Sequence, residues 1–119
     1  MRYMFIVTSA QETAPTPALL EAMGKLTARE ISAGRMIDNA GLMPASLGAR
    51  VSLSAGKLRV LDGPFAEAKE VIGGYAILEL RDRDEAVASA LEFMQLHRDL
   101  LPGWDGTCEV RQVAGGPPR

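Results

Sequence analysis

Cysteine, histidine and tryptophan occur only once each in this chain of 119 residues. The lone Cys108 excludes an internal disulfide, and no Cys/His cluster has the spacing of a zinc site. The sequence also lacks a phosphate-binding loop, a metal-binding triad and a Ser-His-Asp order. We therefore expect no metal and no cofactor, and a reducing cytoplasm as the setting of the protein.

Long apolar runs and an excess of basic residues are absent as well. No stretch approaches the roughly 18 apolar residues of a transmembrane helix, and the short apolar N-terminus is typical of a strand rather than a secretory signal. The chain has 13 Lys and Arg against 15 Asp and Glu, and no basic run that would neutralise phosphates. We expect neither a membrane nor a nucleic acid as a partner.

The remaining composition, 47% hydrophobic and 24% charged residues, is that of one packed domain. The chain divides into strands and helices, as judged from its apolar periodicity, its capping residues and its Gly/Pro turns. The expected strands are 2–9, 35–42, 49–54, 57–61, 71–80 and 108–113, and the expected helices are 17–33 and 82–100. Residues 1–113 then form a single α+β domain, and residues 114–119 form a flexible C-terminal tail.

This order of elements is that of a ferredoxin-like βαββαβ sheet with an inserted β-hairpin and with both helices on one face. The strands at 2–9 and 71–80 are nevertheless apolar on both sides, so the second face of the sheet also needs a cover. A second copy packed sheet against sheet supplies that cover without further sequence. We therefore expect a homodimer of the kind called a dimeric α+β barrel.

The most specific stretch of the sequence contains Asp62-Gly63-Pro64-Phe65, then Glu67 and Lys69, then a strand with Gly73-Gly74. It resembles the signature of the DGPF branch of the YCII-related family, and segment 102–111 is similar to the end of one subgroup of that branch. The resemblance implies a dimeric α+β barrel with a cleft beside the sheet, and it implies no particular reaction. Relatives in that branch are often encoded beside, or fused to, sigma factors of the extracytoplasmic-function type.

Two roles fit Asp62. Its carboxylate follows a strand and precedes Gly-Pro, so it could accept backbone N–H bonds within the turn. Alternatively it is a catalytic group at the mouth of the cleft, with Glu67 and Lys69 nearby to bind a polar ligand or to move a proton. The wider family is associated with a His/Asp pair whose His comes early in the chain. This sequence has no early His, and only Asp62 matches that pair.

Three further residues are candidates for the wall of the cleft. Gly73 shares a strand face with Tyr75 and leaves room for a ligand, whereas Gly74 is expected to allow close packing against a helix. Tyr75 lines either the cleft or the dimer interface. His97 lies in the middle of the apolar stripe of the second helix, where a core role is favoured over ligand binding. In that core role, a backbone carbonyl or a carboxylate near the end of the helix holds the ring.

The sequence supports two functions of different classes. In the first, the cleft binds a small polar molecule, with cofactor-free acid–base chemistry carried by the carboxylates if the protein is an enzyme. In the second, the protein is a regulatory interaction module whose partner is a sigma factor. A broad exposed apolar patch beyond the dimer interface would favour the second function.

Overall fold

The computed structural model describes residues 1–11, 13–65 and 70–115 of the chain. In chain order, its elements are β1 (Arg2–Ser9), α1 (Pro17–Ser32), β2 (Met36–Gly41), the short 3-10 helix η1 (Ala45–Leu47), β3 (Ala49–Ser54), β4 (Lys57–Asp62), β5 (Val71–Glu79), α2 (Arg83–Leu100) and β6 (Gly106–Gln112). All of the expected strands and helices are present, and their bounds differ from the expected ones by at most two residues.

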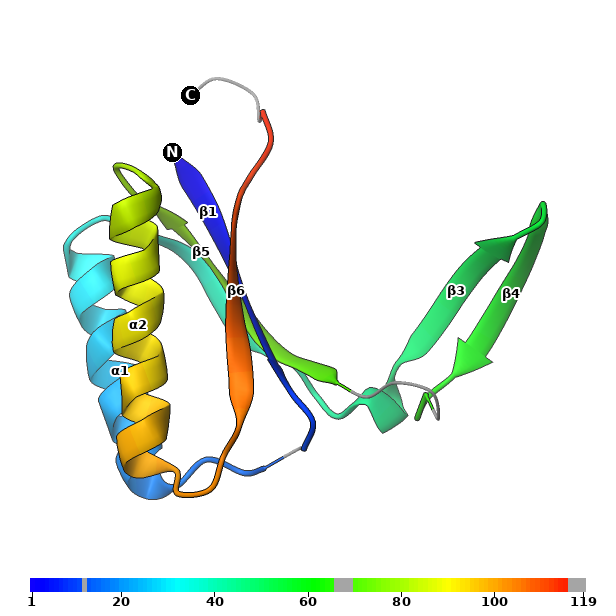
Figure 1. Cartoon of the computed structure of the whole chain (residues 1–119), viewed down its shortest axis with the longest axis horizontal. Helices are drawn as coiled ribbons and strands as arrows, with labels where there is room; N and C mark the ends of the chain where they lie inside the picture. The colour runs from blue at the N-terminus through cyan, green and yellow to red at the C-terminus, as the bar shows by residue number, and fades with distance from the viewer. Residues whose placement is uncertain (12, 66–69, 116–119) are drawn as a thin grey trace.

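Four of the strands form an antiparallel sheet in the order β2-β5-β1-β6. Both helices cover the same face of this sheet, as Figure 1 shows. The predicted ferredoxin-like α+β fold, with both helices on one face, is therefore confirmed. Among the described residues, no helix is both long enough and apolar enough to cross a membrane.

Side-chain caps begin both helices at the places that the sequence indicates. Thr16 Oγ1 accepts a hydrogen bond from the Leu19 amide at 3.1 Å, and its hydroxyl donates to the Leu100 carbonyl at 2.7 Å. Thr16 therefore caps α1 and also ties the start of α1 to the end of α2. At α2, the Asp82 carboxylate accepts from the Glu85 amide at 2.9 Å. A side-chain cap thus fixes the first turn of each helix.

The core lies between the two helices and the centre of the sheet. The register of β1 on β5 pairs Tyr3 with Leu78 and Phe5 with Ala76, which places these four side chains on the face that the helices cover. The cluster of buried core residues is Tyr3, Phe5, Leu78, Leu80, Ala86 and Ala90. Pairing of the two central strands therefore determines which side chains meet the helices.

Gly73 and Gly74 are neighbours in β5, and a β-bulge gives them different surroundings. Val7 pairs with Gly74 and Thr8 pairs with Ile72, so Gly73 is the additional residue of the bulge. A Cβ atom on Gly74 would lie 2.9 Å from the Ala40 carbonyl oxygen, whereas the nearest atom to one on Gly73 would be 4.0 Å away. The close packing expected at Gly74 is present, but it is against the backbone of β2 rather than against a helix.

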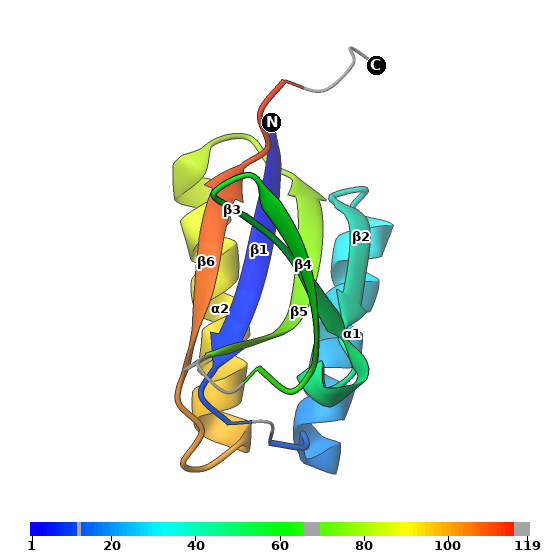
Figure 2. The same ribbon diagram turned by 90° about the vertical axis from the view of Figure 1, so that its right-hand side faces the viewer.

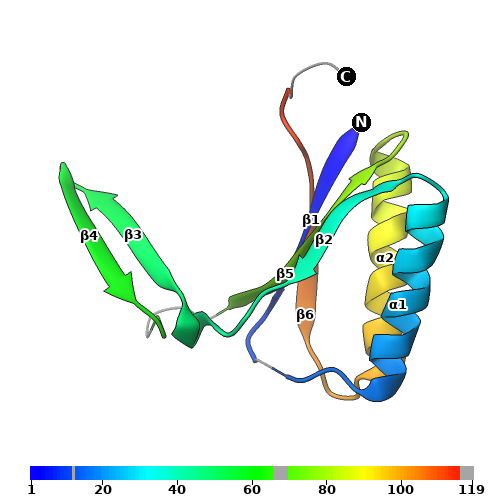
Figure 3. The same cartoon turned by 180° about the vertical axis from the view of Figure 1, so that it is seen from behind.

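Strands β3 and β4 form a separate two-stranded sheet that projects from the rest of the chain. Their connection is Ala55-Gly56, with φ angles of 50° and 77°, the positive values that a type I′ hairpin turn requires. Figure 1 shows the hairpin on the side of the sheet opposite to the helices, and Figure 2 shows it in front of the sheet. The same arrangement is visible from behind in Figure 3. The inserted hairpin is therefore an arm rather than an edge of the main sheet.

The face of the sheet turned away from the helices, called the open face below, has an apolar centre. The register places Met4, Ile6 and Ile77 there, and all three are half-buried. Polar side chains follow at both edges, with Asp38 on β2 and Glu109 on β6. This is the surface on which the sequence predicts a second copy, and the homodimer stays a prediction at this point.

The two glycines of β5 give a matched test of the sheet. We expect Gly74→Val to lower the free energy of unfolding by about 1–3 kcal/mol, because its side chain would push the Ala40 carbonyl away and loosen the pairing of β2 with β5. Gly73→Ala, whose Cβ has ordinary contacts, should change it by less than about 0.5 kcal/mol. Urea unfolding followed by circular dichroism measures both values, and equal losses would contradict this account of the bulge.

Candidate functional site

A cavity of about 880 Å³ lies between the helical layer and the sheet. Residues of α1, α2, β1, β2, β5 and β6 contribute to its walls. The sheet contributes a row of small residues to this wall, namely Gly41, Gly73, Gly74 and Ala76. Because these residues carry little or no side chain, they leave space where larger residues would fill the core. The cavity is large enough for a small organic molecule.

Apolar side chains make up most of the wall. They come from both layers and include Phe5, Val7, Leu19, Met23, Leu26 and Phe93. The α1 members follow a helical spacing of three or four residues, so one face of α1 carries them all toward the sheet. Water in a space of this kind has few hydrogen-bond partners, and an apolar ligand group would readily replace it.

His97 is a polar side chain of α2 in this wall, and it is 6% exposed. Its ring lies between two aromatic neighbours, with centroid distances of 4.5 Å to Phe93 and 4.7 Å to Trp104. Nδ1 lies 3.0 Å from the Phe93 carbonyl oxygen, one turn earlier on the helix. Of the two partners expected for the ring in a core role, a backbone carbonyl or a carboxylate, the structure shows the backbone carbonyl.

The contact with the Phe93 carbonyl also determines the tautomer of the neutral ring. A carbonyl oxygen can only accept, so Nδ1 must carry the hydrogen and donate it. Nε2 is then left with its lone pair, and no residue in the described part of the chain forms a hydrogen bond with it. His97 therefore offers a hydrogen-bond acceptor, held in place by its two aromatic neighbours.

Glu30 is the acidic side chain of the wall and is 4% exposed. Its carboxylate accepts from Arg35 Nε at 2.6 Å and lies 3.5 Å from Arg29 Nη2. Buried charge without such partners would be costly, and the two guanidinium groups neutralise it. Glu30 is thus already satisfied within the protein.

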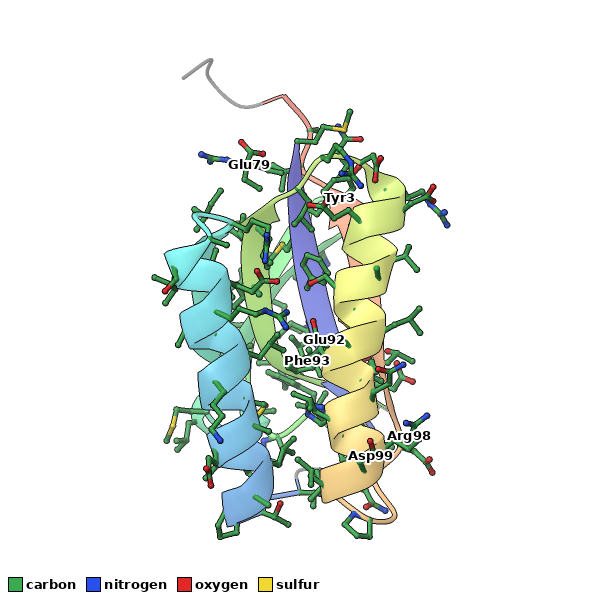
Figure 4. The ribbon with its side chains drawn as sticks, turned by 90° about the vertical axis from the view of Figure 1, so that its left-hand side faces the viewer. Tyr3, Glu79, Glu92, Phe93, Arg98 and Asp99 are labelled. Carbon is green, nitrogen blue, oxygen red and sulfur yellow. The ribbon has the colours of Figure 1, made fainter. Side chains whose placement is uncertain are left out.

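Arg29 also joins the two helices that roof the cavity. Its guanidinium donates to both carboxylate oxygens of Glu92, at 2.7 and 2.5 Å. This hydrogen bonding lowers the pKa of Glu92 and raises the pKa of Arg29. Figure 4 shows Glu92 and Phe93 on the stretch of α2 that faces α1. The bidentate pair therefore helps to set the distance between the helices above the cavity.

Tyr75 and Gly73, two of the candidates named from the sequence, both contribute to the cavity wall. Tyr75 pairs with Ile6 and Ala40, and its hydroxyl donates to Asp38 Oδ2 at 3.0 Å across the open face. This hydrogen bond raises the pKa of Tyr75. The structure thus brings His97 and Gly73 to one cavity, although they are well separated in sequence, whereas the Tyr75 side chain lies on the open face.

Asp62, by contrast, is not in the cavity wall. It ends β4 at the base of the hairpin, where it is exposed, and no hydrogen bond joins its carboxylate to another described residue. The turn beside it is held instead by the Gly63 amide, which donates to the Gly48 carbonyl at 2.9 Å, and by Arg50, whose guanidinium lies 4.1 Å from the centroid of the Phe65 ring. Glu67 and Lys69 lie outside the described residues, and the catalytic role of Asp62 stays a prediction.

Sequence reasoning did not identify Glu30 as part of the wall. A signal was available, because Glu30 follows Leu26 by four residues and continues the inner stripe of α1. In the described part of the chain, no group of three or more His, Cys, Asp or Glu side chains could hold a metal ion.

Comparison with known proteins assigns the chain to a family. Residues 1–93 match the YCII-related domain. The chain belongs to the YCII-related family. An uncharacterized protein of Rhizobium meliloti (strain 1021) is 30% identical over 108 residues, which cover 91% of this chain and 83% of that relative. The resemblance seen in the sequence is thus confirmed for the YCII-related family, and the DGPF branch stays a prediction.

The cavity of this YCII-related domain is built partly from residues beyond the family match. His97, Trp104 and Cys108 all lie in its wall and after residue 93. The part that matches the family supplies β1, β2, β5, α1 and the first part of α2.

Cys108 offers a direct test of how well this wall excludes water. Burial raises the pKa of its thiol to about 11. The reactive thiolate is then scarce at pH 8, and we expect iodoacetamide to modify Cys108 about a hundredfold more slowly in the folded protein than in guanidinium chloride. Mass spectrometry follows the reaction, and the rate should keep rising between pH 8 and pH 11 because the folded thiol still titrates there. A rate equal to that of the unfolded chain would contradict the burial of this side chain.

Proposed function

We propose that this YCII-related domain binds a small molecule that is mainly apolar and carries one hydrogen-bond donor, in the cavity between the helices and the sheet. The observation that supports this proposal is the position of His97, whose ring lies in a largely apolar wall and whose Nε2 forms no hydrogen bond with another described residue. The sequence favoured a polar ligand because it assigned Asp62, Glu67 and Lys69 to the cleft. The described wall is mainly apolar, and the proposed ligand changes accordingly.

The size and composition of the cavity fit this class of ligand. Sites for small molecules usually measure about 300–1,000 Å³ and combine apolar walls with a few polar groups that fix orientation. The cavity of about 880 Å³ has this character, with Phe5, Met23 and Phe93 as apolar wall and His97 as polar group. Burial of the ligand's apolar part would supply most of the binding free energy.

Two polar side chains of the wall, Glu30 and His97, favour a hydrogen-bond donor rather than an anion. The Glu30 carboxylate is already neutralised by Arg35 and Arg29, so it leaves no charge for a ligand to balance. Nε2 of His97 accepts a hydrogen bond when the ring is neutral, which favours a hydroxyl or an N–H group. A phenol or another aromatic alcohol would satisfy both requirements.

The reaction class that this arrangement supports is cofactor-free proton transfer. A ligand hydroxyl bonded to Nε2 could pass its proton to the imidazole, which would act as a general base. The neighbouring Phe93 carbonyl would then accept a hydrogen bond from the imidazolium at Nδ1 and stabilise it. The alternative, a regulatory module for a sigma factor, rests on the resemblance to the DGPF branch.

A change in the cavity wall should block binding. Thr27 lies in the wall, whereas its neighbour Ala28 is exposed and outside it. We expect Thr27→Phe to weaken the binding of 4-propylphenol at least about tenfold, because the new ring occupies space that the probe needs. Ala28→Phe should leave binding unchanged. NMR titration measures both dissociation constants, with the indole N–H of Trp104, the single tryptophan, as the reporter in the wall. Equal affinity in the two variants would refute the site.

A second titration tests the role of His97. The wild-type protein should bind 4-propylphenol about fivefold more tightly than propylbenzene, since one neutral hydrogen bond contributes about 1 kcal/mol. We expect His97→Leu to remove this preference by weakening only the phenol, because leucine keeps an apolar wall but has no acceptor. The same spectra show whether the fold persists. A preference that survives the substitution would assign His97 a purely structural role.

A further inference from the structure

Strand β6 is one edge of the four-stranded sheet, so one side of its backbone is not paired with a strand. On its inner side β6 pairs with β1, and no described strand lies on its outer side. Hydrogen bonds along an antiparallel pair alternate, so every second residue of β6 directs its N–H and C=O groups outward. A further extended segment can add to an edge of this kind.

A hydrogen bond at the end of β6 identifies the residues that face outward. The Val113 amide donates to the Arg2 carbonyl at 2.9 Å, which makes these two a hydrogen-bonded pair, and every second pair along the ladder is of the same kind. Residues 107, 109 and 111 therefore bond to β1. The backbone groups of Cys108, Val110 and Gln112 point to the outer side.

The pairing of β1 with β5 leads to the same assignment. The Met1 amino group donates to the Leu80 carbonyl at 2.9 Å, and the Leu80 amide donates to the Met1 carbonyl at 2.8 Å. Met1 and the odd-numbered residues of β1 thus bond to β5. Only the even-numbered residues remain for β6, as the bond at Arg2 requires.

The side chains of the outward residues lie on the face that the helices cover. The register pairs Cys108 with Val7 and Val110 with Phe5, and Phe5 belongs to the buried core. Side chains of paired residues in a sheet point to the same face. A strand that added to β6 would therefore bring its hydrogen-bonded residues, with their side chains, next to α2.

A groove of about 540 Å³ is present at that place, between α2 and β6. Its apolar wall on α2 is formed by Val87, Leu91 and Met94, whose spacing of four and three residues puts them on one face of the helix. Leu91 is 56% exposed. Cys108 and Val110 form the wall on β6. An extended segment beside β6 would cover the leucine and both strand residues.

One end of the groove is basic. The two elements run in opposite directions, as Figure 1 shows, so Arg83 lies at the Gln112 end and Met94 at the Cys108 end. The Arg83 side chain is exposed, and no carboxylate in the described part of the chain forms an ion pair with it. An acidic side chain of a partner would complement this end of the groove.

We propose that the groove between α2 and β6 binds an extended peptide segment of another protein, which adds to the sheet antiparallel to β6. An antiparallel segment starts at the Arg83 end, and its alternate side chains enter the groove. The first is acidic and meets Arg83, and those two and four positions later are apolar and meet Leu91 and Met94. A Glu-x-Leu-x-Leu segment has this pattern. Backbone hydrogen bonds supply affinity in this mode of recognition, and the alternate side chains supply specificity.

Two lysine substitutions on α2 test the groove. The probe is the fluorescein-labelled peptide Ser-Glu-Thr-Leu-Thr-Leu-Ser, and fluorescence polarisation should show saturable binding to the wild-type chain below about 1 mM. Leu91→Lys should weaken this binding at least about tenfold, because it replaces an apolar contact by a charge. Ala88→Lys adds the same charge at an exposed position of α2 outside the groove and should leave binding unchanged. Equal affinity in the two variants, or no binding by the wild-type chain, would overturn the proposal.

Two methylated peptides test the added strand. The groove-facing leucines of the probe lie opposite outward residues of β6 and donate their N–H groups to it, whereas the threonines direct theirs away. N-methylation of the first leucine should therefore weaken binding at least about tenfold, and N-methylation of the threonine before it should have little effect. Equal effects of the two methyl groups would show that the peptide does not bind as a strand.

A charge exchange tests the direction of the peptide. The wild-type chain should bind the probe about threefold or more tightly than the same peptide with lysine in place of glutamate, and Arg83→Glu should reverse this preference. A preference that Arg83→Glu does not alter would place the acidic residue elsewhere and overturn the assigned orientation. Sedimentation analysis of the chain without peptide adds one further outcome. An assembly that Leu91→Lys dissociates and Ala88→Lys does not would assign this edge to a second copy instead of a peptide.

Discussion

The antiparallel pairing of β1 with β5 is the contact on which the rest of the molecule depends. It joins the first strand of the chain to the strand before α2, and it places Tyr3 and Phe5 beside Leu78 and Ala76 under the helices. The chain start is held in the same ladder, because the Met1 amino group donates to the Leu80 carbonyl at 2.9 Å. Since the two edge strands pair outward from this centre, their register and the position of both helices follow from it.

The same pairing creates the space that a ligand could use. Where β5 carries glycine and alanine instead of large side chains, the helices stand over a hollow rather than a filled core. Unfilled apolar space lowers stability, so a domain of this size can tolerate it only if the remaining core is well packed. The buried Glu30–Arg35 ion pair and the Arg29–Glu92 contact between the helices belong to that supporting frame. The arrangement suits a protein that gains stability when the hollow is occupied.

Much of the fold could be predicted because its signals are local. Thr16 and Asp82 cap helices through residues three positions away, and Ala55-Gly56 sets a turn through its own backbone angles. The candidate site was harder to predict. The sequence interpretation placed Asp62 at the mouth of the cleft, but this residue ends β4 at the base of the hairpin and is not part of the cavity wall. His97, for which the sequence favoured a core role, also lies in that wall, and the Phe93 carbonyl holds its ring.

The sequence by itself determined the order of strands and helices and the two-faced character of the central strands, because both depend on residues within about one helical turn or one strand period. Tertiary structure alone decided that Glu30, His97 and Gly73 share one cavity and that the hairpin stands apart from the sheet. Those relations join residues that are distant along the chain. The packing of helices on the sheet sets them, and no local pattern encodes that distance.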